Sequence, residues 1–262
     1  MTSSPRTVPR RTALAAGGAA LLSGCGPAVP APARNLPGGE AGKNAPGPVV
    51  LLGDSVFDNG GYVAGGKSTG DHLEDAMADA GAGWSAVLAA RDGAVSSDVP
   101  GQVAGAAELL EQGYAALSAG GNDALRSSAI LTKPVSNAVD VFEELADLRE
   151  FFEERYNAAV GSAAEAAGGR VVVCTIYDPN YEEPRRQRPA TAALPAFNDV
   201  ILRVAARRGL PVIDLRTAFV APDDYANPIE PSVAGGKKLA GLIRRVVTTH
   251  DFAAGGCRIY TT

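Results

Sequence analysis

The chain has 262 residues, of which 46% are hydrophobic and 20% charged, and this composition is typical of one globular domain of moderate size. A domain of this length buries a sizeable core without needing disulfides or a structural metal ion. The formal net charge of −5 excludes the overall basic field that holds nucleic acid, so no nucleic-acid partner is expected.

Residues 1–24 have the features of an export signal. They contain three arginines and no acidic residue, followed by an apolar stretch that is too short for a permanent membrane span. The arginine pair at positions 10 and 11 indicates the twin-arginine route. The sequence Leu-Ser-Gly-Cys that ends at Cys25 is similar to the lipobox of bacterial lipoproteins, in which the cysteine is lipidated after cleavage. We therefore expect a lipoprotein anchored through Cys25 at the outer face of the bacterial cell membrane.

Residues 25–47 consist mostly of proline, glycine and alanine. Such a segment cannot bury enough apolar surface to fold, and it predicts a disordered tether. The folded domain is accordingly predicted to occupy residues 48–262.

The predicted strands begin with residues 49–52, which are wholly apolar and end at Gly53, as expected of a strand buried on both faces. Four further segments are predicted strands: 84–90, 114–118, 170–176 and 211–215. Apolar residues spaced by three and four positions predict helices over 138–156, 194–204 and 239–247. Alternating strands and helices favour an α/β fold, a three-layer α/β/α sandwich with a flavodoxin-like, five-stranded parallel sheet.

In a sheet of this kind, ligands bind beyond the carboxyl ends of the strands near the point where the strand order reverses, here between the first and third strands. The first strand is followed by Gly-Asp-Ser ending at Ser55, the second by Gly93, and the third by Gly-Gly-Asn-Asp containing Asn122. A serine in this position could attack a carbonyl group. Backbone N–H groups and the asparagine amide could then hold the oxyanion that develops.

These three motifs resemble the first three blocks of the SGNH (GDSL) hydrolase family, and the resemblance extends over residues 48–262. It implies a serine hydrolase that acts on carboxylic esters through an acyl-enzyme on Ser55, with Asp54 as an accessory residue. It also implies an oxyanion hole made by the backbone N–H groups of Ser55 and Gly93 and the side chain of Asn122.

The last block departs from the family pattern. The family has Asp-x-x-His before the C-terminal helix, whereas this chain has Asn227 and Glu230 at those two positions. Three explanations remain open. Glu230 could be the general base, with its pKa raised by burial and its orientation set by Asn227. The base could instead be His72, which lies after a glycine-rich loop and near a predicted helix start, while His250 follows the last predicted helix at the opposite edge.

In the third explanation catalysis is lost, and the protein is an envelope lipoprotein that binds acylated glycan or lipid. An active enzyme is expected to act on small-molecule, glycan or lipid esters. No set of residues with metal-ligand spacing and no dinucleotide motif occurs, so no cofactor and no metal are expected. Cys174 lies in an apolar run typical of a core, and whether it pairs with Cys257 is left open.

Overall fold

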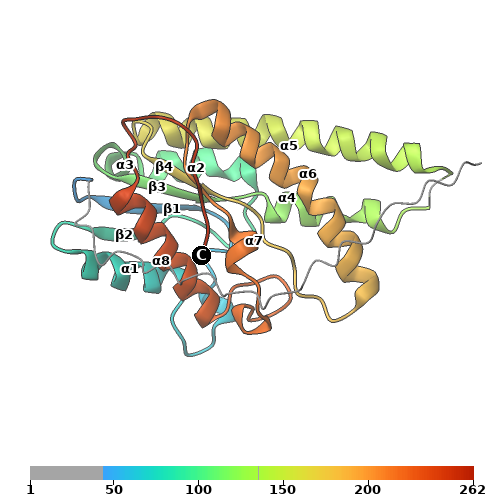
Figure 1. Ribbon diagram of the computed structural model, residues 1–262, viewed down its shortest axis with the longest axis horizontal. Helices are drawn as coiled ribbons and strands as arrows, with labels where there is room; N and C mark the ends of the chain where they lie inside the picture. The colour runs from blue at the N-terminus through green and yellow to red at the C-terminus, as the bar shows by residue number, and fades with distance from the viewer. Residues whose placement is uncertain (1–43, 135) are drawn as a thin grey trace, which may run out of the picture. The chain divides into compact units, whose positions relative to one another are not determined.

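The computed structural model describes residues 44–134 and 136–262, and in it a parallel sheet lies between two layers of helices (Figure 1). The strand order is β2-β1-β3-β4-β5-β6, and every neighbouring pair is parallel. The strands are β1 (Pro48–Gly53), β2 (Ser85–Leu88), β3 (Tyr114–Ser118), β4 (Val171–Cys174), β5 (Val212–Ile213) and β6 (Ile259–Tyr260).

The predicted three-layer α/β/α class and the reversal of strand order between β1 and β3 are confirmed, and all five predicted strands form. The predicted strand number is wrong by one, because β6 adds a sixth strand beside β5. This strand has only two residues, of which Ile259 is half exposed. Two residues are too few to produce the alternating or continuous apolar pattern from which strands are recognised.

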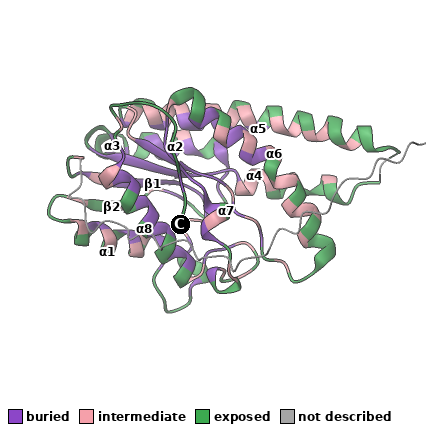
Figure 2. Ribbon diagram, in the orientation of Figure 1, coloured by how far each residue is buried: buried purple, intermediate pink, exposed green. Residues whose placement is uncertain are grey.

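Strands β1, β3, β4 and β5 are buried on both faces, as their apolar sequences predict, whereas the edge strand β2 is partly exposed (Figure 2). Successive side chains along a strand point to opposite faces. In β1, Val50 and Leu52 therefore enter the core on one side of the sheet, whereas Val49 and Leu51 enter the core on the other. All four side chains are completely buried.

The helices divide between these two cores. One face is covered by α1, α7 and α8, and the other by α2, α3, α5 and α6. The helices are α1 (Thr69–Ala80), α2 (Val99–Gly105), α3 (Ala107–Gln112), α4 (Gly121–Arg126), α5 (Ala138–Ala166), α6 (Pro184–Arg208), α7 (Leu215–Ala218) and α8 (Val233–Thr249). Short 3₁₀ turns are η1 (Gly60–Tyr62), η2 (Ser96–Asp98), η3 (Ser128–Leu131) and η4 (Pro222–Asp224). Among the described helices, none has the length and apolar character that a membrane span requires.

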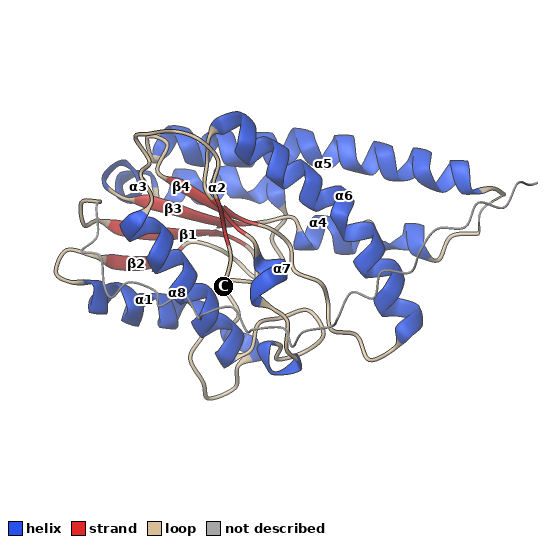
Figure 3. Cartoon of the chain, in the orientation of Figure 1, coloured by secondary structure: helices blue, strands red, loops and turns tan. Residues whose placement is uncertain are grey.

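The three predicted helices form, and each is longer than its apolar pattern. The helix predicted to begin at residue 194 begins ten residues earlier, at Pro184. Pro189 and Pro195 lie inside it, and prolines normally end a helix because they lack the N–H donor. The helix predicted from residue 138 has no buried side chain before Phe152, and this first half extends past the carboxyl edge of the sheet (Figure 3).

The described domain includes the residues just before the predicted start at position 48. The Asn44 side chain donates hydrogen bonds of 2.8 Å to the backbone carbonyls of Val247 and His250 at the end of α8. The predicted signal peptide, the lipidation site Cys25 and most of the predicted tether lie outside the described residues. Cys174 is buried in the core and Cys257 is exposed, and the two do not form a disulfide with each other in the described part of the chain.

The carboxyl end of β1 requires glycine. Gly53 has a φ of +124°, and a Cβ atom built on it would lie 1.7 Å from the carbonyl oxygen of Ser118 on β3. The Gln102 side chain completes the hydrogen bonding of this residue: its Oε1 accepts from the Gly53 N–H at 2.7 Å and its Nε2 donates to the Gly53 carbonyl at 2.8 Å. The turn that follows β1 is therefore held at one defined position.

We expect Gly53→Ala to lower the free energy of unfolding by about 3 kcal/mol or more, because the new methyl group meets backbone that cannot move aside. Gly101→Ala in α2 is the matched control. Its Cβ meets nothing within 4 Å, so the helical residue is expected to be neutral or to stabilise by up to about 1 kcal/mol. Urea denaturation of both variants measures the difference, and equal midpoints would contradict the expectation.

Candidate active site

Ser55 lies in a tight turn directly after β1, at the carboxyl edge of the sheet. The turn is closed by the carbonyl of Asp54, which accepts hydrogen bonds of 3.1 Å from the backbone N–H groups of Phe57 and Asp58. The Ser55 side chain is nearly buried yet lines the large cavity at this edge. The turn thus presents the hydroxyl to a ligand in the cavity.

The Ser55 hydroxyl donates a hydrogen bond of 3.0 Å to Oε1 of Glu230, a residue 175 positions further along the chain. Glu230 is only 5% exposed, and burial raises the pKa of its carboxyl group above the ordinary value. The hydrogen bond from Ser55 opposes this rise, and the negative charge of Asp92 adds to it. The other oxygen, Oε2, is buried and has no hydrogen-bond partner among the residues that the structure describes. A serine hydroxyl and a carboxylate of increased basicity therefore meet directly.

The loop that carries Glu230 is held through its main chain. The Asn227 side-chain oxygen accepts from the backbone N–H groups of Ile229 at 2.9 Å and Glu230 at 3.0 Å. Asn227 therefore orients Glu230 through the backbone turn and makes no hydrogen bond to its carboxylate. The sequence predicts an orienting role for Asn227, but the contacts that provide it are visible only in the structure.

Two residues whose roles were not predicted hold the same loop from outside. The Tyr177 hydroxyl, after β4, donates to the carbonyl of Ile229 at 2.6 Å. The Asn59 amide donates to the carbonyl of Pro231 at 2.9 Å, and its oxygen accepts from the Thr69 N–H, at the start of α1, at 2.7 Å. Asparagine and tyrosine are ordinary residues in loops, so only their long-range partners reveal these roles.

Asp54 is almost completely buried beside the serine. Its Oδ1 accepts a hydrogen bond of 3.1 Å from the backbone N–H of Val56, which stabilises the turn. Burial, together with the smaller effect of the nearby charges of Glu230 and Asp123, raises the pKa of Asp54 to about 7. Two carboxyl groups with raised pKa values thus lie near the hydroxyl of Ser55.

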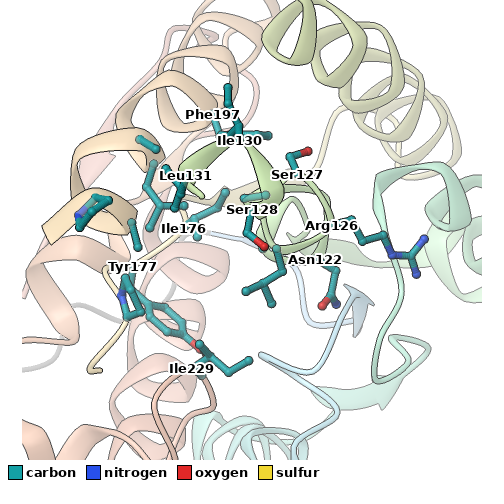
Figure 4. Close-up of a pocket in the computed structure, with 18 of the residues that line it drawn as sticks. Asn122, Arg126, Ser127, Ser128, Ile130, Leu131, Ile176, Tyr177, Phe197 and Ile229 are labelled. Atoms are coloured by element: carbon teal, nitrogen blue, oxygen red, sulfur yellow. The ribbon is translucent and has the colours of Figure 1, made fainter. Parts of the chain in front are cut away.

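The candidate oxyanion donors lie at the ends of β1, β2 and β3. Within the described residues, neither the Ser55 nor the Gly93 backbone N–H has a hydrogen-bond acceptor. The Asn122 amide donates one hydrogen bond of 2.9 Å to the carbonyl of Ala94, which leaves its second hydrogen available. Asn122 lines the same cavity as Ser55 (Figure 4). Gly93 is not among the residues that line the cavity, so the structure places two of the three predicted oxyanion residues, Ser55 and Asn122, at its wall.

The structure does not bring His72 into contact with Ser55. His72 lies in α1, which packs against α8, and no hydrogen bond joins it to Ser55 or Glu230. His250 caps the far end of α8, where its Nδ1 lies 2.9 Å from the Tyr260 hydroxyl oxygen. In the described part of the chain, no group of three or more histidine, cysteine or acidic side chains is placed to hold a metal ion.

A cavity of about 680 Å³ opens beside Ser55 and Asn122. Its walls come from the end of β3, α4, η3, the first half of α5, the segment after β4, and the first half of α6. Figure 4 shows several apolar side chains of this lining, among them Ile130, Leu131 and Ile176. The cavity falls within the volume range of small-molecule sites.

Comparison with known proteins supports this interpretation of the fold. Residues 51–238 match the model of the GDSL-like lipase/acylhydrolase family. Among solved structures, a lipase from a goat rumen metagenome has a TM-score of 0.62 at 17% identity, covering 78% of this chain and 99% of that one. An extracellular lipase from Streptomyces rimosus has a TM-score of 0.55 at 22% identity, covering 78% of this chain and 100% of that one.

An acetylxylan esterase from Geobacillus stearothermophilus is also similar, with a TM-score of 0.55 at 17% identity, covering 79% of this chain and 95% of that one. A search of curated proteins found no match. At sequence identities this low, the structural similarity establishes a common fold alone.

We expect Asp54→Asn to gain stability relative to the parent protein as the pH rises from 4.5 to 8. Unfolded Asp54 loses its proton near pH 3.8, whereas the folded protein retains it to about 7. The folded state therefore binds more protons between these values, and the contribution of Asp54 to stability falls as the pH increases through this window. Asparagine keeps the acceptor for the Val56 N–H and removes this titration.

The measurement is the melting temperature of the variant minus that of the parent at both pH values. Asp79→Asn, at an exposed position in α1, is the control for the loss of a carboxyl group. A difference for Asp54→Asn that stays constant with pH would show that the folded protein does not retain this proton.

Proposed function

The chain belongs to the GDSL-like lipase/acylhydrolase family and is an ester hydrolase; from this premise we propose that it cleaves carboxylic esters with Ser55 as nucleophile and Glu230 as general base. The observation that carries the proposal is the hydrogen bond of 3.0 Å from the Ser55 hydroxyl to the buried carboxylate of Glu230. A nucleophile within hydrogen-bond reach of its base is the arrangement that activates serine.

In the first half of the reaction, Ser55 Oγ attacks the ester carbonyl while Glu230 takes the hydroxyl proton. The carbonyl oxygen becomes an oxyanion, which accepts hydrogen bonds from the Ser55 and Gly93 N–H groups and the Asn122 amide. Glu230 then returns the proton to the alcohol oxygen as the C–O bond breaks, leaving the acyl group on Ser55. In the second half, Glu230 takes a proton from water, the water oxygen attacks the acyl carbon, and Ser55 leaves with the proton.

A carboxylate serves as the base here because its surroundings raise its pKa. An exposed glutamate is a weak base toward serine, whereas burial of Glu230 disfavours its charged form and strengthens its attraction for a proton. Within residues 44–134 and 136–262, Oε2 has no hydrogen-bond partner that would stabilise the anion further. Asn227 is neutral and orients Glu230 through the main chain, so it adds no second charge at this point.

We propose further that the enzyme is exported by the twin-arginine route and anchored to the outer face of the cell membrane through Cys25. The support is the sequence of residues 1–25, which lie outside the described residues. Esters within reach of such an anchor include acylated glycans, lipids and small exported esters.

We expect Ser55→Ala to abolish hydrolysis of a p-nitrophenyl ester and to abolish labelling by a fluorophosphonate. Glu230→Gln is expected to lower kcat about 10²- to 10⁴-fold, because the amide keeps the size of the side chain but cannot take the proton. Glu165→Gln, exposed on α5, is the matched control.

His72→Ala decides between the two candidate bases. Full activity in Glu230→Gln together with loss in His72→Ala would identify the histidine as the base. A parent protein that neither turns over esters nor reacts with the fluorophosphonate would instead be a binding protein for acylated ligands.

We expect kcat/KM to fall on the acid side with a midpoint above pH 4.5, the ordinary value for glutamate, because only deprotonated Glu230 accepts the serine proton. The charge of Asp92 contributes to the raised pKa of Glu230, so Asp92→Asn should move this midpoint to lower pH. Because Asp92 is exposed, 1 M salt should screen its charge and reduce the difference in midpoint between the parent protein and Asp92→Asn. If the pH midpoint of kcat/KM is unchanged in Asp92→Asn but shifts in His72→Ala, the assignment of Glu230 as the general base is contradicted.

A further inference from the structure

We propose that the cavity beside Ser55 binds the acyl chain of the substrate, and that the enzyme prefers esters of linear aliphatic acids of about eight or more carbons over acetyl esters. This inference rests on the proposed ester hydrolysis at Ser55 and adds the class of acid that the site accepts. It is drawn from the volume, lining and exposure of the cavity walls.

The volume is far larger than an acetyl group needs. A methylene group occupies on the order of the 30 Å³ that a water molecule takes up in the liquid, so an eight-carbon chain fills roughly 240 Å³. The cavity of about 680 Å³ accommodates such a chain with space for part of the alcohol. An acetyl group would leave most of the cavity filled with water.

The walls suit a hydrocarbon chain. Three separate elements contribute aliphatic or aromatic side chains to the lining, which are Ile130 and Leu131 from η3, Leu145 and Leu148 from α5, and Leu194 and Phe197 from α6. Figure 4 shows Ile130, Leu131 and Phe197 on the same side of the cavity. A glycan would instead need convergent hydrogen-bonding groups along these walls.

Charged lining residues lie outside this apolar part of the walls. Arg185 and Arg186 stand at the start of α6, where the Arg186 guanidinium lies 4.1 Å from the centroid of the Tyr181 ring. Arg126 is in α4 and donates to the carbonyl of Gly93 at 3.2 Å. Apart from Ser128 in η3 and the two arginines in the first turn of α6, every residue that η3, α5 and α6 contribute to the lining is aliphatic, aromatic or proline.

Several apolar side chains of these walls are partly exposed to solvent. Leu131 is 40% exposed, and Leu145, Leu148 and Leu194 are only half-buried. The first half of α5 has no buried side chain, although it carries part of the wall. Apolar surface in contact with water favours an apolar occupant, because covering it releases that water. An acyl chain entering from Ser55 supplies this cover.

The first experiment measures kcat/KM for p-nitrophenyl esters of two, four, eight and twelve carbons, each below its aggregation concentration. Burial of one methylene group corresponds to about a fourfold gain, so octanoyl should exceed acetyl by at least about 100-fold. A parent enzyme that prefers acetyl over octanoyl overturns the proposal.

Ala193→Phe tests the cavity itself, because Ala193 lines it from α6 and a phenyl ring there would occupy the space of the chain. The ratio of octanoyl to acetyl activity should fall at least tenfold. Ala192→Phe is the matched control, since the neighbouring Ala192 is exposed and does not line the cavity. Equal ratios in the two variants overturn the proposal. If Ala193→Phe does not fold, Leu131→Gln, at a partly exposed wall position, takes its place and should lower the ratio in the same direction.

A binding measurement separates this inference from the proposed function. A calorimetric titration of the Ser55→Ala variant with dodecanoate should show binding. The binding should be lost in double variants that combine Ser55→Ala with Ala193→Phe or with Leu131→Gln. If no ester is hydrolysed but dodecanoate binds in this way, the hydrolase proposal fails and the acyl-chain site stands. If esters are hydrolysed with no gain from longer chains and dodecanoate does not bind, the acyl-chain site fails and the hydrolase stands. If neither occurs, both fail.

Discussion

The hydrogen bond between Ser55 and Glu230 is the contact on which the rest of the site depends. It joins the first strand of the sheet to the loop before the last long helix, two segments that lie 175 residues apart. Both side chains are nearly buried, so a small displacement of either segment would leave a hydroxyl or a carboxylate without its partner. The architecture on both sides of the bond therefore has to be rigid.

Side-chain amides provide much of this rigidity, since they satisfy both the donor and the acceptor of a backbone residue. Gln102 pairs in this way with Gly53 at the end of β1, and Asn198 pairs with Ile176 after β4 through two bonds of 2.8 Å. Asn59 joins the serine turn, the start of α1 and the Glu230 loop. The backbone groups that these amides bind lie where the chain enters or leaves regular structure, and buried groups there have no neighbouring strand or helical turn to complete their hydrogen bonding.

The sequence predicts the layers and most strands because long apolar runs and helical spacing report burial directly. It misses β6, which is too short to show a period, and the first ten residues of α6, which contain Pro189, a residue that normally ends a helix. At the site, motif order brings Ser55, Asn122 and Glu230 to one edge, as predicted. The contacts of Asn59 and Tyr177 could not be predicted, because their partners are backbone carbonyls distant in sequence. Which of Glu230 and His72 lies within hydrogen-bond reach of Ser55 could not be predicted either, because that depends on three-dimensional placement.

The way in which the Glu230 loop is held has a consequence for how such a site can change. Tyr177, Asn59 and Asn227 all bind the main chain of this loop, so its course does not depend on which side chain stands at position 230. Because these contacts fix the backbone and do not involve the side chain of residue 230, the loop should tolerate a different side chain at that position. The identity of the proton acceptor and the shape of the pocket are then separable properties, and selection can exchange one while preserving the other.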